Sequence, residues 1–242
     1  MAWNSERIWV AGEEFPHSSS QVKKAGDRIR RASSRNESPS DDDLELLDLF
    51  RSSHYPTLRQ VQEELVRLFH EKERLDPRFV PITARPLKTR EAIIAKLIRE
   101  KARLNRIHDI AGARIVVSSR VIQALVLRVI MERLPELKPQ VAKDSTEHGD
   151  AQGYRAIHVV VTTSAPGIGE RHAEIQIRTE MENEWAQLVE RLDAVLGLDL
   201  KHGQGPAEYQ EWLREASAVI GAVDRGEATT IQEIPPFPGI TP

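Results

Sequence analysis

The sequence RHAEIQIRT, at residues 171–179, decides the fold class and holds the first candidate site. Side chains alternate between the two faces of a β-strand, so Ile175 and Ile177 are expected to point together into the core. The opposite face then carries a carboxylate, an amide and a guanidinium, which are those of Glu174, Gln176 and Arg178. Many half-buried sheets have such a polar face in water, so alternation alone does not separate a binding site from a solvated surface.

A second strand is predicted over residues 154–163, and the sequence APGIG at residues 165–169 suits a hairpin connection between the two strands. The same alternation places Tyr154, Ala156 and His158 on one face. If the strands pair, an aromatic ring and an imidazole would meet the carboxylate and guanidinium of the first strand. The pairing would therefore gather four kinds of functional group on one surface.

Asp109 immediately precedes residues 110–117, a stretch rich in β-branched residues that is predicted to form a buried strand. A carboxylate at the end of a sheet is well placed to hold a cation, although a cap or turn role is the alternative. Mg²⁺ prefers one or two carboxylates and takes its other ligands from water and substrate phosphates. Asp109 and Glu174 would meet that requirement without a cage made of protein alone.

Helical periodicity accounts for most of the remaining chain. Helices are predicted over residues 44–50, 58–69 with Thr57 as cap, 121–134, 180–196 and 207–223, and after Pro86 with the stripe Ile93, Ile94, Leu97 and Ile98. Short extended stretches are expected over residues 79–84 and 140–143. Together these elements predict an α+β fold with a small mixed, mostly antiparallel sheet flanked by helices.

The composition changes along the chain and predicts its organisation. We expect a mobile or loosely docked arm over residues 1–43, because this segment is rich in Ser, Arg and Asp and poor in large apolar side chains. The acidic run at residues 41–43 follows Ser40 and is interpreted as a capped helix start rather than a metal site. The main domain is expected over residues 44–205, a helix over 206–226 and an unstructured Pro-rich tail over 227–242.

The bulk numbers exclude several classes of protein. With 242 residues, 40% apolar and 29% charged, the composition is that of an ordinary soluble protein, and its net charge of −3 argues against non-specific coating of nucleic acid. No apolar run approaches the ~20 residues of a membrane span, and residues 1–10 lack signal-peptide features, so a cytoplasmic protein is expected. The absence of cysteine excludes disulfides and thiol catalysis. Residues 85–106 carry eight Lys or Arg and two Glu, which suits phosphate but also describes a solvated helix face.

Four segments, in order, resemble the synthetase domain of the RelA/SpoT family. They are the basic segment with Lys88-Thr89 and Lys96, DIAGAR at 109–114, GYRAIH at 153–158, and EIQIRT at 174–179 followed by Trp185-Ala186. The resemblance covers about residues 44–205 and implies a nucleotidyltransferase-like synthetase domain. It also implies the activity, which is transfer of the β,γ-pyrophosphate of ATP to the 3′-hydroxyl of a nucleotide, with GDP or GTP giving (p)ppGpp.

The resemblance implies a role for each residue of the motifs. Asp109 and Glu174 would be catalytic and would hold Mg²⁺, with Glu174 also the base for the attacking hydroxyl. Cationic side chains would clamp the ATP phosphates, and these are Arg85, Lys88, Lys96, Arg114 and Arg178. Tyr154 would stack on the acceptor base. The other acceptor contacts would come from Arg155, His158 and Gln176.

Departures from the family pattern bear on the adenosine contacts and on the acceptor. Pro86, Ala92 and Ala156 stand where the family has Arg, Ser and a small polar residue. Glu190 replaces a common His, and with KHGQG at 201–205 it resembles toxin-type small synthetases, which are often paired with an antitoxin. Some of that branch pyrophosphorylate the 3′-terminal adenosine of tRNA. The partners implied are therefore ATP and either a guanine nucleotide or the tRNA 3′ end, with an antitoxin and a homo-oligomer left open.

Three other functions compete with this interpretation. A stringent-response hydrolase is disfavoured because His108-Asp109 is the only His-Asp pair and no further His ligand set accompanies it. An ordinary nucleotidyltransferase would offer a Gly-Ser turn followed by Asp-x-Asp, which the sequence lacks in a matching context. A catalytically silent nucleotide-binding regulator remains an alternative, and the retention of Asp109 and Glu174 speaks against it.

Overall fold

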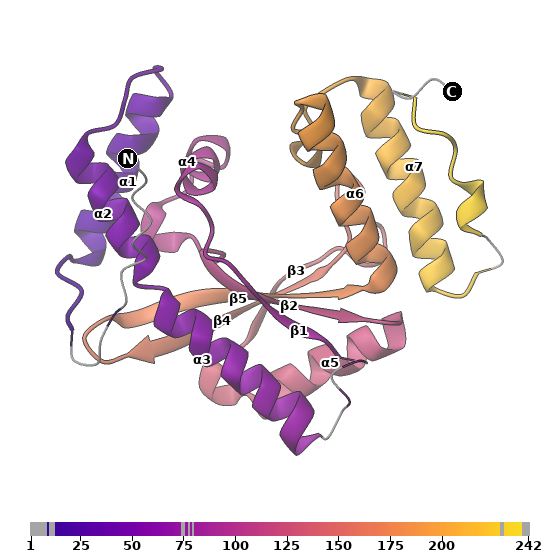
Figure 1. The fold of residues 1–242 in the computed structure, drawn as a ribbon, viewed down its shortest axis with the longest axis horizontal. Coiled ribbons are helices and arrows are strands. Elements are labelled where there is room, and N and C mark those ends of the chain that lie inside the picture. The colour runs from indigo at the N-terminus through magenta and orange to yellow at the C-terminus, as the bar shows by residue number, and fades with distance from the viewer. Residues whose placement is uncertain are drawn as a thin grey trace.

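A five-stranded sheet forms the middle of the computed structural model, which describes residues 9, 13–73, 76, 78, 80–227 and 230–238 (Figure 1). Its strands lie in the order β1-β2-β5-β4-β3. Only β2 and β5 run parallel among these neighbours, so the sheet is mixed and mostly antiparallel, as predicted. The bounds are β1 (Ile82–Arg85), β2 (Ala111–Val117), β3 (Gln140–Asp144), β4 (Ile157–Ala165) and β5 (Gly169–Thr179).

Two helices, α3 (Tyr55–Val66) and α5 (Arg120–Arg133), cover one face of the sheet (Figure 1). The predicted alternation is confirmed there, because Ile175 and Ile177 of β5 are fully buried in the core on this side. The close pairing of β2 with β5 depends on Gly112, where an added Cβ would lie 2.6 Å from the backbone oxygen of Glu174. The glycine of DIAGAR therefore lets the two central strands approach.

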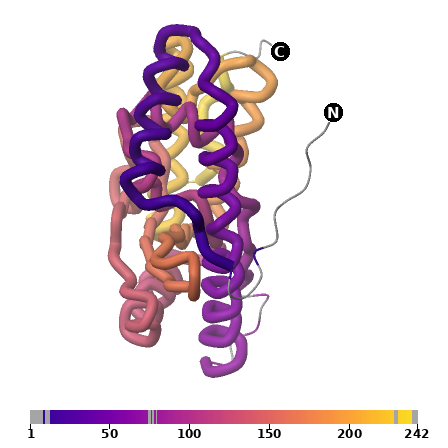
Figure 2. The backbone as a smooth tube through the Cα atoms, turned by 90° about the vertical axis from the view of Figure 1, so that its left-hand side faces the viewer, coloured from indigo at the N-terminus to yellow at the C-terminus, as the bar shows by residue number. Residues whose placement is uncertain are grey.

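The other helices stand on the opposite side of the sheet as two lobes (Figure 1). One lobe contains α1 (Ser19–Ser33), α2 (Asp41–Ser52) and α4 (Arg90–Arg99), and the other contains α6 (Glu180–Leu196) and α7 (Ala207–Asp224). A side view shows the first lobe in front of the second (Figure 2). Short helical turns are η1 (Arg67–Lys72), η2 (Leu104–Arg106), η3 (Pro135–Leu137), η4 (Leu200–His202) and η5 (Ile231–Glu233).

Part of the arm that was predicted to be mobile or loosely docked is the helix α1. A capping box between Ser18 and Gln21 begins it, and its buried face packs in the first lobe through Val22, Ala25 and Ile29. Few large apolar residues are needed, since one apolar residue per turn is enough for an amphipathic helix to pack. Residues 1–8 and 10–12 of the arm lie outside the described residues.

The Pro-rich tail also departs from the expectation where it is described. The ring of Phe237 packs against Trp212 and Tyr209 of α7, with centroids 5.0 and 4.8 Å away. The indole of Trp212 donates to the carbonyl of Pro235 at 2.6 Å. An aromatic anchor therefore docks residues 230–238 on α7, a contact that composition alone does not predict.

Two helix starts test the cap predictions. Ser40 caps α2, as predicted, by accepting from the backbone N–H of Asp43 at 3.3 Å. Thr57 is not a cap, because α3 begins at Tyr55 and Thr57 lies inside the helix. Its hydroxyl forms a hydrogen bond of 2.8 Å with the hydroxyl of Thr163 of β4.

Of the extended stretch predicted over 79–84, Phe79 lies outside the described residues and the strand covers Ile82–Arg85. None of the helices in the described ranges combines the length and apolar character needed to cross a lipid bilayer.

Candidate active site

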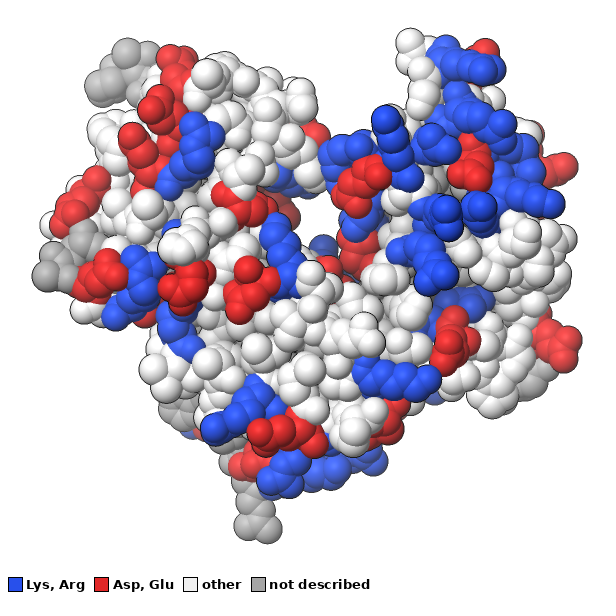
Figure 3. Space-filling model, turned by 180° about the vertical axis from the view of Figure 1, so that it is seen from behind, with Lys and Arg blue, Asp and Glu red and all other residues white. Residues whose placement is uncertain are grey.

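A cavity of about 610 Å³ lies between the two lobes, above β4 and β5. The surface is visibly hollowed there, with Lys and Arg side chains at the rim (Figure 3). Ten of the eleven predicted site residues line it, which are Arg85, Lys88, Lys96, Asp109, Arg114, Tyr154, His158, Glu174, Gln176 and Arg178. The remaining one, Arg155, does not.

A closed ring of side-chain hydrogen bonds joins the predicted residues of β5 to those around β4. The pairing of His158 with Gln176 across the two strands sets it up. Glu174 accepts from His158 Nδ1 at 2.8 Å and from Gln176 Nε2 at 2.8 Å. Arg178 donates to the Gln176 oxygen at 3.1 Å and to the Tyr154 hydroxyl at 2.6 Å. The Tyr154 hydroxyl and His158 Nε2, 3.0 Å apart, complete the ring.

This ring is satisfied by one tautomer of His158. If Nδ1 carries the proton and donates to Glu174, then Nε2 is free to accept the Tyr154 hydroxyl proton. The tyrosine oxygen can then accept from Arg178 while its proton goes to His158. Every member therefore holds its neighbours in place, as preorganised catalytic groups require.

Glu174 is held ionised by this ring. Burial opposes ionisation, but the hydrogen bonds from His158 and Gln176 and the attraction of His158 outweigh it and lower the pKa of Glu174. A carboxylate with a lowered pKa is a modest proton acceptor and a good partner for a cation. Its place therefore suits metal binding at least as well as proton transfer.

Asp109 holds the two lysines of the basic segment. Its carboxylate oxygens lie 3.0 Å from Lys88 Nζ and 3.0 Å from Lys96 Nζ. Burial would raise the pKa of Asp109, but the two ammonium groups prevail and lower it. Lys96 reaches it from α4, which begins with Thr89 as its cap. Two ammonium groups thus share one carboxylate, which phosphates could replace as their partner.

The acidic side chains of the cavity decide which kind of divalent-cation site it can form. Among the described residues no group of three or more His, Asp or Glu could hold a metal ion. Asp109 and Glu174 line the same cavity, and two carboxylates are enough for Mg²⁺ when substrate phosphates and water supply the other ligands. The residues therefore fit an ion bridged by phosphate and do not fit an all-protein metal site.

Arginines make the cavity electropositive. The Nε atoms of Arg114 and Arg178 are buried and have no hydrogen-bond partner among the described residues. Burial, together with repulsion from Arg178 and Arg85, lowers the pKa of Arg114. Buried guanidinium groups with unused donors favour an anion that brings matching acceptors.

Residues that the motifs did not indicate also line the cavity, and Lys143 is the clearest. Its Nζ lies 5.4 Å from the centroid of the Tyr154 ring and 2.7 Å from a carboxylate oxygen of Asp150. It pairs with His158 across β3 and β4, beside an irregularity between Val141 and Lys143. Strand pairing could have placed it, but the sequence does not show which strand β3 joins.

Arg155 lies apart from the other ten predicted residues. The structure buries it to 5% exposure away from the cavity, although the resemblance implied acceptor contacts. Its Nε donates to the hydroxyl of Ser217 of α7 at 3.0 Å and to the carbonyl of the same residue at 3.1 Å. The guanidinium also donates to the carbonyls of Thr146 and Glu147 at 2.6 and 2.8 Å. Arg155 therefore joins α7 to the loop before β4 and does not face a ligand.

We expect Arg155→Met to lower the free energy of unfolding by about 3 kcal/mol, because it leaves several buried acceptors without donors. Urea unfolding measures the change, with Arg214→Met, an exposed arginine of the same α7, as the matched control. An unchanged free energy of unfolding, together with a raised KM for the acceptor, would instead show that Arg155 binds the acceptor.

The sequence has relatives among known proteins. Residues 85–192 match the model of the region found in RelA / SpoT proteins. An uncharacterized protein of Mycobacterium tuberculosis is 33% identical over 123 residues, which is 50% of this chain and 42% of that protein. GTP pyrophosphokinase YwaC of Bacillus subtilis is 29% identical over 147 residues, covering 57% and 67%. The chain thus spans less than half of the first of these relatives.

The fold has a counterpart among solved structures. Small alarmone synthetase 1 from Bacillus subtilis superimposes with a TM-score of 0.59 at 24% identity, over 73% of this chain and 91% of that one. That likeness concerns the fold alone, and the family is indicated by the matched sequence region. Residues 85–192 of this chain therefore contain the region found in RelA / SpoT proteins.

Proposed function

We propose that the chain is an ATP-dependent pyrophosphokinase that transfers the β,γ-pyrophosphate of ATP to the 3′-hydroxyl of GDP or GTP. The observation that carries this proposal is the cavity itself. It places the carboxylates of Asp109 and Glu174, whose pKa values are lowered, among cationic side chains that include the five predicted ones. Such a surface suits a polyphosphate with a cation, because phosphoryl chemistry needs positioning and charge neutralisation more than covalent help.

The cationic side chains hold the ATP phosphates in this proposal. Lys88 and Lys96 leave Asp109 for the β- and γ-phosphates, which frees the carboxylate. Arg85, Arg114 and Arg178 complete the clamp. Mg²⁺, held by Asp109 and Glu174, would neutralise charge on the phosphates.

Transfer then follows from the position of the acceptor. The 3′-oxygen attacks the β-phosphorus, the bond from that phosphorus to the α,β-bridging oxygen breaks, and AMP leaves. Glu174 takes the proton of the hydroxyl, while His158 and Gln176 fix the direction of its carboxylate. In this proposal the Tyr154 ring stacks on the acceptor base, and Arg178 Cζ lies 5.0 Å from its centroid.

Two substitutions of Tyr154 separate its ring from its hydroxyl. Tyr154→Ala is expected to raise the acceptor KM about tenfold, because stacking on a base is worth about 1–3 kcal/mol. Tyr154→Phe keeps the ring and opens the hydrogen-bonded ring around Glu174, so it should lower kcat more than it changes KM. Steady-state kinetics with varied acceptor measure both. Equal effects of the two variants on KM would contradict stacking.

A second acceptor, the 3′-terminal adenosine of tRNA, is favoured by the charge on the first lobe. Lys and Arg side chains gather over the part of the surface formed by that lobe (Figure 3). The exposed Lys and Arg residues in and around α1 and α4 include Lys24, Arg28, Arg31, Arg35, Arg99, Lys101, Arg103 and Arg106. A basic surface beside the cavity could contact tRNA phosphates outside the site. On this alternative the protein is a toxin that blocks translation and has an antitoxin partner.

The acceptor is tested directly. The protein is incubated with γ-³²P-ATP and Mg²⁺ and with GDP, GTP or deacylated tRNA in separate reactions. Label in GDP or GTP supports the proposal, and label in tRNA alone supports the toxin. No label in any acceptor, with ATP bound, would leave the catalytically silent regulator as the better account.

A further inference from the structure

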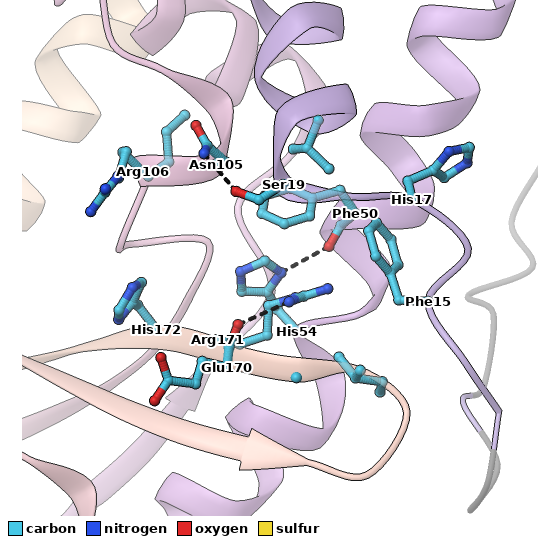
Figure 4. A pocket seen from close by; sticks show the side chains of 14 residues that line it. Phe15, His17, Ser19, Phe50, His54, Asn105, Arg106, Glu170, Arg171 and His172 are labelled. Atoms are coloured by element: carbon cyan, nitrogen blue, oxygen red, sulfur yellow. Dashed lines mark hydrogen bonds between the residues drawn. The ribbon is translucent and has the colours of Figure 1, made fainter.

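A second cavity, of about 410 Å³, lies where α1, η2 and the turn after α2 meet the start of β5 (Figure 4). None of the described residues that line it also lines the candidate active site. One wall is apolar and includes Phe15, Phe50 and Ile107. Arginine and histidine side chains line other parts of the cavity. Figure 4 shows Arg171 near the centre of the cavity, with Arg106 and His172 at the edge.

Arg171 is a buried cation without a counter-ion. It is 9% exposed and forms no ion pair with a carboxylate of the described residues. Its Nε donates to the Ser53 hydroxyl at 2.8 Å and its Nη1 to the Glu170 carbonyl at 2.9 Å. Nη2 is buried and has no partner among the described residues. An arginine stays charged in proteins, so this site holds a positive charge that nothing on the described chain neutralises.

Aromatic rings stabilise that charge only in part. The guanidinium carbon lies 4.8 Å from the centroid of Phe15 and 5.1 Å from that of Phe50. Burial still lowers the pKa of Arg171 to about 10, which reflects the cost of removing this charge from water. A purely structural clamp on Phe15 accounts for the ring contacts and leaves the unused Nη2 donors unexplained.

Further basic side chains line the rest of the cavity. Arg106 of η2 is exposed beside it and forms no ion pair with any described residue. His172 lies on the same side, with its ring 4.5 Å from that of His108. The one carboxylate among the described lining residues, Glu170, points to Lys138 at 3.1 Å. Two arginines therefore line a cavity whose one carboxylate among the described lining residues is paired with Lys138.

We propose that this cavity is a second anion site and binds a phosphate group. Guanidinium forks suit the several oxygens of phosphate, Arg106 and Arg171 both line the cavity, and its volume admits a phosphate with a small attached group. The phosphate is either free or part of a nucleoside monophosphate, whose base the Phe15 wall would cover. The proposal does not depend on the activity proposed for the other cavity. The two sites are neighbours, since His172 and Glu174 are two residues apart on β5.

The test follows phosphate binding at this cavity by a local signal. Sodium phosphate and AMP are titrated in turn at constant ionic strength, while the ring signals of His172 are recorded by ¹H–¹⁵N NMR. Variants are Arg106→Gln, Arg171→Met and Lys88→Gln, which removes a cation of the other cavity. Arg59→Gln, with 83% side-chain exposure on α3, is the control.

The expected result is a saturable shift of the His172 signals, about tenfold weaker in Arg106→Gln and absent in Arg171→Met. The control and Lys88→Gln should retain it. Tighter binding of AMP identifies the nucleotide as source, and equal or tighter binding of phosphate identifies the free ion. No saturable shift, an equal response to chloride, or an unchanged affinity in Arg106→Gln would overturn the proposal. Arg106 is exposed, so this variant decides the matter even if Arg171→Met does not fold.

Discussion

Glu174→Gln is expected to reduce kcat for pyrophosphate transfer about 10³-fold, within the range for loss of a general base. The amide keeps the size of the side chain and an oxygen that can accept from His158, so the fold should survive. It removes the negative charge that the ring of hydrogen bonds stabilises by lowering the pKa of Glu174. Initial rates of label transfer from γ-³²P-ATP measure the loss.

The matched control for this variant is Glu184→Gln. Glu184 is an exposed glutamate on α6 that does not line the cavity, so its substitution should leave kcat within about twofold. A Glu174→Gln enzyme with wild-type kcat would remove Glu174 from the chemistry. The proposed proton transfer would then have no acceptor on β5.

Asp109→Asn is expected to lower kcat/KM for ATP by about 10² or more, because it weakens cation binding and also releases two lysines. Both ammonium groups lie 3.0 Å from the carboxylate, so the neutral amide takes the nearest negative charge from Lys88 and leaves Lys96 with Glu100 at 3.7 Å. The loss should diminish at high Mg²⁺ if the carboxylate holds the ion. Rates over a Mg²⁺ titration measure this.

Asp42→Asn controls for the loss of a negative charge, since Asp42 is exposed in the first turn of α2, away from the cavity. A defect in Asp109→Asn that is the same at every Mg²⁺ concentration would assign Asp109 to holding the lysines alone. Wild-type kcat/KM in Asp109→Asn would remove it from the site altogether.

The candidate site was largely predictable because local rules determine it. Alternation along β5 places Glu174, Gln176 and Arg178 together, and a short hairpin turn brings His158 opposite Gln176. The position of Asp109 in the site follows because it lies just before β2, the parallel neighbour of β5. Each of these inferences needs only strand periodicity, turn chemistry and the order of the motifs.

The features that were missed depend on contacts between distant parts of the chain. Arg155 lies in a motif, yet its direction is decided by α7, where an added Cβ at Gly221 would lie 2.6 Å from the guanidinium carbon. Lys143 enters the cavity through an irregular pairing of β3 with β4. The unpaired charge of Arg171 becomes visible only when Phe15 and Phe50 pack around it. Local patterns contain no information on such packing.

The product released from ATP is the most direct test of the proposed pyrophosphate transfer. Pyrophosphate transfer, nucleotidyl transfer and phosphate transfer release AMP, pyrophosphate and ADP respectively, so the by-product identifies the bond that breaks. ATP labelled at the α- and γ-positions, incubated with the protein, Mg²⁺ and the accepted acceptor, is resolved by chromatography. We predict AMP in equal amount to acceptor carrying the γ-label. Pyrophosphate with α-label on the acceptor, or ADP with γ-label on it, would contradict the proposed reaction.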